Sequence, residues 1–416
     1  MSHAGTFYDL LSTVFDRRFS FRKLDDGRPI DEICRDLLSS KGEISAIKLG
    51  QLILDRFDAM SDKETESFFR FLSEELEIDP EEILKATNAY QILPNSENLD
   101  ALMSSASSPR QVLLRRINQV PGATERLVRM REKLLDLVKN DEAFKRADLD
   151  FQHLFRSWFN RGFLVLRRID WQSPASILQK IIQYEAVHEI DDWDDLRRRV
   201  DPVDRRCYAF FHPSMPDDPL IFVQVALCNE VPTSVQKILA RERDSLDPEK
   251  ASIAAFYSIS NCQKGLKGIS FGNSLIKQVV HDLIVELPHF KTFITLSPLP
   301  KFAKWLREQT EEGDEIDSEE LKKQAAKYLC QAKANDKYPY DPVARFHLNN
   351  GAMIHKIHAD ADVSENGLKQ SYAVMVNYLY DLDKVSENHE NFAIKQEVVK
   401  SREITGLLPK QRKSDA

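Results

Sequence analysis

Glycine is scarce and unevenly placed in this chain, and its distribution constrains the fold more than any other feature. The chain has 13 glycines in 416 residues, roughly half the usual frequency of about 7%. None occurs between Gly50 and Gly122, whereas Gly265, Gly268 and Gly272 lie close together. Because glycine supplies the left-handed positions of tight turns, its scarcity predicts a helix-rich protein and excludes collagen-like, low-complexity and many-bladed β architectures.

Charge and hydropathy exclude further classes of protein. The chain carries 58 Lys plus Arg against 66 Asp plus Glu, a formal net charge of −8, which argues against a general nucleic-acid binder. No segment approaches the ~20 consecutive apolar residues of a membrane span. The N-terminal residues include Asp9 and Asp16 and lack an apolar signal core, so we expect a cytoplasmic protein with no membrane partner. The scattered cysteines, odd in number, predict reduced thiols rather than a disulfide framework.

Residues 1–150 predict one helix after another. Apolar residues recur at three- and four-residue spacing, in the segments 31–38, 62–72, 107–117 and 124–138. Ser61, Asp79 and Ser108 are suitable helix caps, the last two followed by proline. No catalytic cluster occurs here, since the only histidine is His3. We interpret 1–150 as an all-α domain for assembly or partner contact.

The second half, 151–416, predicts strands alternating with helices. Strand-like runs rich in Phe, Val and Ile are found at 209–213, 220–227, 254–260, 290–296 and 372–380. Helices are expected over 274–287, near Pro300 and over 318–334. Residues 345–358 predict a hairpin with Asn349-Asn350-Gly351 as its turn. Strand, glycine cluster, helix and strand make a βαβ unit inside a mixed sheet, so the predicted fold class is α+β.

The glycine cluster CQKGLKGISFGNSLIK, from Cys262 to Lys277, lies between a predicted strand and a predicted helix. Backbone amides exposed by glycines, together with the start of the helix, suit a phosphate or pyrophosphate. The pattern is neither a P-loop nor GxGxxG, which disfavours a dinucleotide site. A turn eased by glycine and flanked by solvated lysines explains the motif equally well.

Two polar positions are further candidates. Ser297 ends a predicted strand before Pro298 and Pro300, where it either caps the next helix or faces a ligand at the strand end. His347 is expected at a solvent-open strand end, where its imidazole would titrate near neutrality. By strand alternation His355 and His358 fall on opposite faces, so we expect no metal site there.

Four segments, in this order, resemble the malonyl-CoA decarboxylase family: FYSISNCQKGLKGISFGNSLIKQVV, ITLSPLPKFAKWL, DPVARFHLNNGAMIHKIHADADVS and VNYLYD. The similarity extends from about Phe151 to Tyr380. The preceding helices fit that family's N-terminal domain by type and position only.

The resemblance implies a helical oligomerisation domain, 1–150, joined to a catalytic domain of the GNAT acyltransferase fold, 151–416. It implies conversion of malonyl-CoA to acetyl-CoA and carbon dioxide without a metal or organic cofactor, and a homotetramer built as a dimer of dimers. The family's coenzyme A loop corresponds to Lys267, Gly268, Ile269, Ser270, Phe271, Gly272 and Asn273. Its catalytic serine, catalytic histidine and active-site tyrosine correspond to Ser297, His347 and Tyr380. Some members carry a glutamate in place of Ser270, so a role for that carboxylate does not transfer.

The chemistry of such a reaction fits these residue types. Loss of carbon dioxide from a 3-carboxy thioester leaves an enolate that needs hydrogen-bond donors and then a proton. We expect His347 to protonate the carbon, Ser297 to hold the malonyl carboxylate or relay a proton, and Tyr380 to support them. Two alternatives stay open: a GNAT-type acyl-CoA transferase acting on an amine, and a non-catalytic scaffold that senses acyl-CoA.

Overall fold

The computed structural model describes residues 27–269, 275–309, 316–334 and 338–409. These residues form two compact units. The first runs to Phe159 and also includes the turn that starts at Lys264; the second contains the remainder of the chain. The boundary expected near residue 150 falls inside helix α9 (Lys145–Trp158).

The first unit is helical, as the scarcity of glycine predicts. Its other α-helices are α2 (Ile30–Ser39), α3 (Glu43–Asp58), α4 (Asp62–Glu74), α5 (Pro80–Ile92), α6 (Ser96–Ser105), α7 (Pro109–Ile117) and α8 (Ala123–Val138), with 3-10 turns η1 (Glu142–Phe144) and η4 (Lys264–Leu266). The three predicted caps are confirmed: Ser61 forms a capping box with Glu64, and the side chains of Asp79 and Ser108 accept from backbone amides of their helices.

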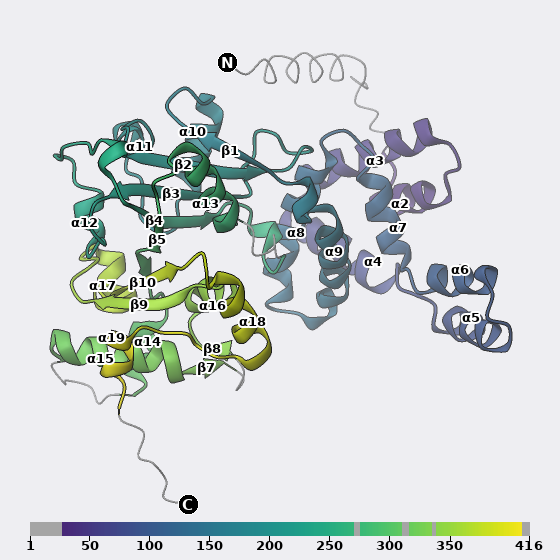
Figure 1. The fold of residues 1–416 in the computed structure, drawn as a ribbon. Coiled ribbons are helices and arrows are strands. Elements are labelled where there is room, and N and C mark those ends of the chain that lie inside the picture. Colours follow the sequence, from purple (N-terminus) through teal and green to yellow (C-terminus); the bar gives the residue numbers. More distant parts are fainter. Residues whose placement is uncertain (1–26, 270–274, 310–315, 335–337, 410–416) are drawn as a thin grey trace, which may run out of the picture. The chain divides into compact units, whose positions relative to one another are not determined.

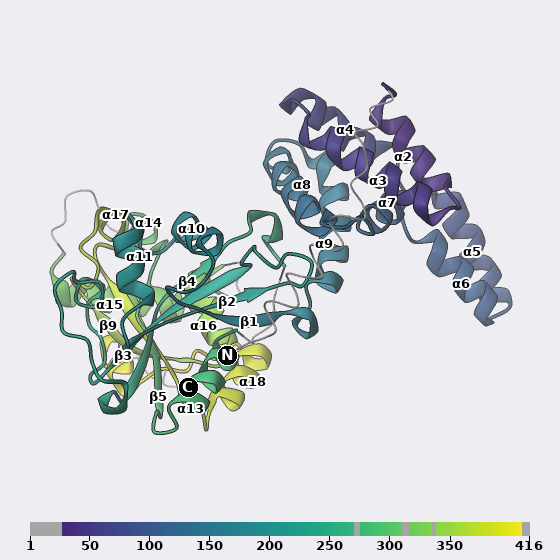
Figure 2. The same cartoon turned by 90° about the horizontal axis from the view of Figure 1, so that it is seen from above.

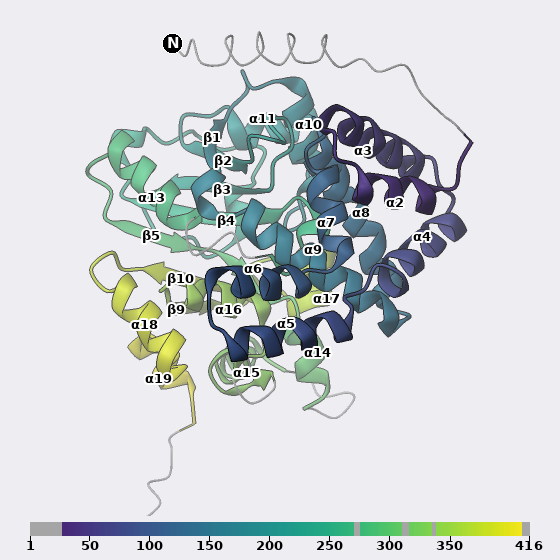
Figure 3. The ribbon, with the colours of Figure 1, turned by 90° about the vertical axis from the view of Figure 1, so that its right-hand side faces the viewer.

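Helices α5 and α6 differ from the rest of the first unit, because no residue of either helix is buried. They lie side by side as a hairpin (Figure 3). Several of their large apolar side chains are exposed, among them Leu84 at 62%, Ile92 at 84% and Met103 at 64%. An apolar surface of this kind on a helix pair is typical of a contact region.

The second unit is built on an eight-stranded mixed sheet (Figure 1). Its strands are β1 (Val165–Ile169), β2 (Arg205–Phe211), β3 (Ile221–Cys228), β4 (Ile253–Asn261), β5 (Thr292–Thr295), β6 (Ser297–Pro298), β9 (Met353–His358) and β10 (Met375–Tyr380). The order is β1-β2-β3-β4-β5-β10-β6, with β9 also paired to β10. Among the paired strands of the described residues, only β4 and β5 run parallel, and α13 (Leu275–Glu286) lies between them in the chain. The predicted βαβ unit and the α+β class are therefore confirmed.

Helices cover both faces of this sheet (Figure 2). On one face, α10 (Ala175–Tyr184) and α11 (Trp193–Val200) pack on residues such as Phe211 and Phe222. On the other face, the core contains α13 and residues from α14 (Phe302–Arg307), α15 (Ser318–Gln331), α16 (Pro342–Asn349), α18 (Val385–Lys395) and α19 (Arg402–Leu407). Alternate residues of β2 thus enter these two cores, Tyr208 and Phe210 on one face and Cys207, Ala209 and Phe211 on the other. The remaining elements are η2 (Arg161–Phe163), α12 (Val235–Ile238), η3 (Pro248–Lys250), β7 (Lys333–Ala334), β8 (Tyr338–Pro339) and α17 (Glu365–Ser371).

The hairpin predicted over 345–358 is wrong in its first half, because residues 342–349 form helix α16 and only β9 is a strand. Asp341 caps this helix and Pro342 occupies its first turn. Asn350 and Gly351 then end the helix, with Gly351 at φ +85°. The same residue types that favour a hairpin turn also favour a helix C-terminus, and here they do the latter.

No helix in the described ranges combines the length and apolar character needed to cross a membrane.

Candidate active site

Ser297, His347 and Tyr380 form one hydrogen-bonded chain in the second unit. The Ser297 Oγ lies 3.1 Å from His347 Nε2, and His347 Nδ1 lies 2.8 Å from the Tyr380 hydroxyl oxygen. All three side chains are buried. The structure therefore brings together three residues that the sequence placed on separate motifs.

His347 is held by helix α16. The Asp341 carboxylate accepts from the amides of Val343 and Ala344, both at 2.8 Å, and this cap fixes where the helix begins. His347 then lies in the last turn of α16, packed inside the unit. The prediction of a solvent-open strand end is wrong, because the residue is on a buried helical face.

Ser297 is held by the sheet. Its strand β6 pairs with β10, where Ser297 lies opposite Val376. The helix that follows, α14, begins at Phe302 and has Lys301 as its N-cap without a side-chain hydrogen bond. Ser297 therefore does not cap a helix, and the capping interpretation is wrong. The alternative, a strand-end hydroxyl available for chemistry, fits the observed position.

Burial sets the protonation state of the chain. Because His347 is fully enclosed, burial lowers the pKa of its imidazole to about 3. Burial also raises the pKa of Tyr380 well above its ordinary value. In this state both rings are neutral near pH 7, which corrects the expectation that His347 titrates near neutrality.

The direction of the hydrogen bonds follows from their partners. The Ser297 hydroxyl donates to Thr295 Oγ1 at 2.8 Å. The Ser297 oxygen is then free to accept from a proton on His347 Nε2, which leaves Nδ1 to accept from the Tyr380 hydroxyl. The protons thus point from Tyr380 through His347 and Ser297 toward Thr295.

Thr295, Tyr378 and Asn377 belong to the same environment and were not predicted from the sequence. Thr295 Oγ1 also accepts from the Tyr378 amide at 3.1 Å, and the Tyr378 ring stacks on His347 with centroids 4.5 Å apart. The side-chain amide of Asn377 donates from Nδ2 to the Thr295 carbonyl at 2.7 Å. Two-residue alternation along a strand places Thr295 beside Ser297, a usable sequence signal for this one residue.

The strand arrangement leaves the parallel pair incomplete beside Ser297. Strands β4 and β5 pair only over Ile253–Phe256 and Thr292–Thr295, although β4 continues to Asn261. Against β3, the register of β4 shifts at Tyr257, which marks a β-bulge. The pairing thus ends where the chain enters β6 at Ser297, and ligand sites in open sheets lie outside such strand ends.

The histidines and acids after His347 do not gather around one point. His358 Nε2 lies 2.5 Å from Asn377 Oδ1, while Asp362 accepts from Gln236 at 3.0 Å. His355 and His358 both belong to β9, three positions apart. Within the residues that the structure describes, no group of three or more His, Cys, Asp or Glu side chains is arranged to hold a metal ion.

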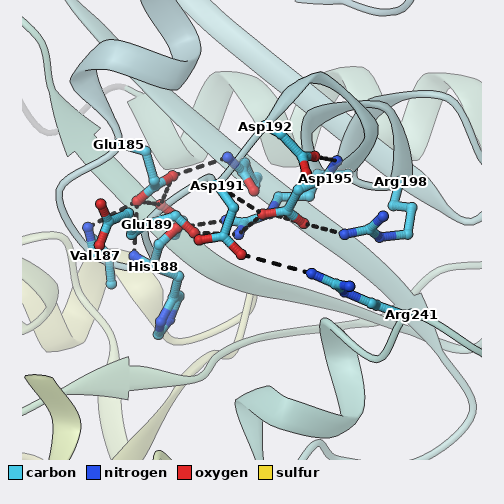
Figure 4. Close-up of polar contacts among 12 residues, drawn as sticks. Glu185, Val187, His188, Glu189, Asp191, Asp192, Asp195, Arg198 and Arg241 are labelled. Carbon is cyan, nitrogen blue, oxygen red and sulfur yellow. Dashed lines mark hydrogen bonds and ion pairs between the residues drawn. The ribbon is translucent and has the colours of Figure 1, made fainter. Parts of the chain in front are cut away.

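A second polar cluster lies between α10 and α11 (Figure 4). The Glu185 carboxylate accepts from Ser258 and Gln224 side chains at 2.8 and 2.9 Å and from the amide of Val187 at 2.8 Å. His188 lines an adjoining cavity of about 880 Å³. These contacts fix the loop after α10 against the sheet, and none of its residues was predicted as a site.

The predicted coenzyme A loop is described only in part. Lys267, Gly268 and Ile269 follow the 3-10 turn η4 and belong to the first unit. Gly268 has φ +80°, a conformation that favours glycine. Ser270, Phe271, Gly272 and Asn273 lie outside the described residues.

Two family models match this chain. One, described as the malonyl-CoA decarboxylase C-terminal domain, matches residues 162–320 and 308–416. The other, described as the malonyl-CoA decarboxylase N-terminal domain, matches residues 76–159. Together they match residues 76–159 and 162–416, so helices α2, α3 and α4 lie outside both matches.

Individual proteins agree with the family models. The mitochondrial malonyl-CoA decarboxylase of Rattus norvegicus is 35% identical over 348 residues, which cover 71% of this chain and 70% of the relative. That of Anser anser anser is 33% identical over 354 residues, with coverages of 72% and 70%.

Solved structures extend the similarity to the fold. The crystal structure of malonyl-CoA decarboxylase from Rhodopseudomonas palustris has a TM-score of 0.85 at 42% identity, covering 91% of this chain and 98% of that one. The Agrobacterium vitis structure has a TM-score of 0.85 at 43% identity, with coverages of 91% and 99%. By sequence and by structure, the chain belongs to the malonyl-CoA decarboxylase family.

Proposed function

We propose that this protein decarboxylates malonyl-CoA to acetyl-CoA and carbon dioxide, using Ser297, His347 and Tyr380. The observation that carries the proposal is the buried hydrogen-bonded chain of these side chains, in a member of a family whose relatives are named for this reaction. A buried Ser–His–Tyr chain also lies in a low dielectric, where electrostatic interactions with a bound substrate act most strongly.

The reaction needs two things from the protein. Cleavage of the carbon–carbon bond leaves an electron pair that the thioester carbonyl accepts as an enolate, which must be stabilised by preorganised donors. The α-carbon must then receive a proton from a positioned acid. No covalent acyl-enzyme is required, because no nucleophile attacks the thioester.

His347 supplies the proton in this proposal. Its imidazole is neutral in the structure, since burial lowers its pKa to about 3. A malonyl carboxylate placed beside Ser297 brings a negative charge next to the ring, and a nearby opposite charge favours the protonated form. Substrate binding thereby raises the pKa of His347, so that the ring takes up a proton from solvent, gives it to the α-carbon and returns to its neutral form. Ser297 would hold the carboxylate, and Tyr380 would hold the ring.

We propose that no metal or organic cofactor takes part. The thioester carbonyl of the substrate is itself the electron acceptor, so coenzyme A enters as part of the substrate. The coenzyme A moiety is assigned to Lys267, Gly268 and Ile269, together with Ser270, Phe271, Gly272 and Asn273, which lie outside the described residues. Turnover that survives dialysis against a strong chelator supports this view, and turnover that returns only with added metal contradicts it.

The direct test is to incubate the purified protein with malonyl-CoA alone and measure acetyl-CoA by chromatography. We expect acetyl-CoA to accumulate without any added acceptor. An acyl-CoA transferase would require an amine acceptor, and an acyl-CoA-sensing scaffold would bind malonyl-CoA without turnover. Either of those outcomes rejects the decarboxylase.

We further propose a homotetramer, a dimer of dimers, assembled through the first unit. The exposed apolar side chains of α5 and α6 support this assignment, since they are unburied within the chain.

A cytoplasmic location is also proposed. The five cysteines are all free thiols, as is typical of a reducing compartment, and cell fractionation tests it.

A further inference from the structure

We propose that Arg131, a buried arginine of helix α8, is a positioning residue for the coenzyme A end of the substrate. It orients the peptide between Lys267 and Gly268 so that the Gly268 amide can donate to the pyrophosphate. The inference rests on the proposed function, because it assumes that this turn binds coenzyme A. Nothing in the motifs around Arg131 marks it as part of a site.

The contacts of Arg131 are unusual for an arginine on a helix. Only 1% of its surface is exposed. Its Nη1 donates to the carbonyl oxygens of Gly265 at 2.6 Å and of Lys267 at 2.9 Å. One guanidinium nitrogen thus donates to two carbonyls of the glycine turn, which belong to residues 134 and 136 positions further along the chain.

The guanidinium is itself held in place. Arg131 Nε donates to Asp148 Oδ1 at 2.7 Å, and the other oxygen of Asp148 accepts from Gln152 at 2.6 Å. The planar fork of arginine satisfies the carboxylate and the carbonyls at once, which the single ammonium of lysine cannot reproduce. The ion pair of Arg131 and Asp148 therefore links helix α8, helix α9 and the turn.

This ion pair determines where the amides of the turn point. In a trans peptide the carbonyl and the following N–H point in opposite directions. Because the Lys267 carbonyl faces Arg131, the Gly268 N–H faces away from it. The amides of Lys267 and Ile269 are used inside the turn, bonding Lys264 and Leu266 carbonyls at 3.0 Å each. Among backbone hydrogen bonds of the described residues outside regular helices and strands, none uses the Gly268 amide.

Gly265 gives a second, independent constraint on the same turn. A Cβ at this position would lie 1.9 Å from the Val128 carbonyl oxygen. Only glycine lets the turn approach α8 this closely, and Val128 lies one helical turn before Arg131. Close packing and the hydrogen bonds of the arginine together restrict the conformations open to the turn.

A fixed amide is what a pyrophosphate requires. Backbone N–H groups in glycine turns bind anionic phosphate oxygens, and a donor that is already oriented loses little conformational entropy on binding. The effect should appear in substrate affinity, because the pyrophosphate does not change during decarboxylation. Binding energy of this kind is equal in the ground and transition states and acts on KM.

The test compares Arg131→Lys with Arg129→Lys, a control on the same helix whose arginine is exposed and paired with Glu125. Each variant is assayed with malonyl-CoA and with malonyl-pantetheine, which lacks the pyrophosphate. For Arg131→Lys we expect KM for malonyl-CoA to rise about tenfold, the scale of one charge-assisted hydrogen bond. We expect kcat, and both constants for malonyl-pantetheine, to stay within about twofold of wild type.

Equal losses with both substrates would overturn the proposal, since they would indicate general damage to the fold; so would an unchanged KM for malonyl-CoA. Circular dichroism and thermal unfolding verify that the variants fold. If Arg131→Lys does not fold, Asp148→Asn tests the same ion pair, and we expect the same rise in KM, confined to malonyl-CoA. Calorimetric titration with coenzyme A needs no turnover. A higher Kd for the variant than for wild type therefore upholds the inference even if wild type fails to decarboxylate.

Discussion

At the scale of single residues, the environment of His347 decides what the site can do. Its ring is enclosed between Tyr378, Tyr380 and Ser297, and no charged side chain contributes to its lowered pKa, which is due to burial alone. A neutral imidazole in this position accepts a new charge only when a counter-charge arrives. The pKa of His347 should therefore rise when an anionic substrate binds beside it.

Replacing the proposed proton donor should abolish most of the activity. We expect His347→Ala to lower kcat for malonyl-CoA by roughly two or more orders of magnitude, the usual effect of losing a general acid. Acetyl-CoA formation in the steady state measures it. His281→Ala, at an exposed position on α13, is the matched control and should retain wild-type kcat. A His347→Ala variant with wild-type kcat would remove the histidine from the mechanism.

The buried imidazole also predicts how stability depends on pH. The pKa of His347 in the folded state is about 3, below its value of roughly 6.5 in an unfolded chain. As pH falls below 6.5 the unfolded state takes up a proton that the folded state refuses, so the free energy of unfolding decreases. The loss approaches about 1.4 kcal/mol per pH unit.

Urea unfolding of wild type and His347→Gln between pH 7 and pH 5 measures this contribution. We expect wild type to lose more stability than the variant over that interval. Parallel curves for the two proteins would mean that His347 is not kept neutral by burial.

At the scale of elements, helix α16 presents His347, and Asp341 determines where that helix begins. The Asp341 side chain is fully buried. Besides two helix amides it accepts from the Tyr328 hydroxyl at 2.8 Å. A buried carboxylate with three donors is both a cap and a link between α15 and α16.

Removing this cap should damage stability and activity together. We expect Asp341→Ala to lower the free energy of unfolding by about 2–4 kcal/mol, because it leaves three buried donors without an acceptor. It should also lower kcat, since His347 lies at the far end of the same short helix. Denaturant unfolding and the acetyl-CoA assay check both.

Asp317→Ala is the control for this prediction, because Asp317 caps α15 in the same way through the Glu320 amide but its helix begins near the surface. It should cost about 1 kcal/mol and leave kcat unchanged. Equal effects of the two substitutions on kcat would contradict a specific role for α16.

At the scale of the whole molecule, the chain combines a helical unit with a unit built on a mixed sheet, and the segment that starts at Lys264 belongs to the helical unit. This segment carries the glycine turn onto α8. The helical unit would therefore have a role in substrate binding besides the proposed role in oligomerisation. It supplies the support for the turn that the proposed function assigns to coenzyme A.

The helical hairpin of α5 and α6 gives a prediction about assembly. We expect the double variant Leu84→Glu and Ile92→Glu to shift the protein to a smaller oligomer in sedimentation velocity. The two glutamates replace exposed apolar side chains, and their charges would have to be desolvated at an interface. Ile394→Glu, at a 75% exposed position on α18, should sediment like wild type. An unchanged oligomer in the hairpin variant would place the contact elsewhere.

Much of this architecture follows from local sequence signals. Apolar spacing and the caps Ser61, Asp79 and Ser108 identify helices of the first unit, because capping and periodicity depend on neighbours within a few residues. Strand-like runs identify the central sheet for the same reason. The segment around Asn349 shows the limit: its turn residues fit either a hairpin or a helix end, and Asp341 with Pro342 decides for the helix.

The sequence by itself determined the helical first unit, the βαβ core, the glycine turn and, through family resemblance, the three candidate residues. Only the tertiary structure decided that Ser297 and His347, 50 residues apart, share a hydrogen bond, that the imidazole is neutral, and that Arg131 holds the glycine turn. These features depend on burial and on contacts between distant segments. Local patterns carry no information about either, because a side chain's solvation and partners are set by how the whole chain packs.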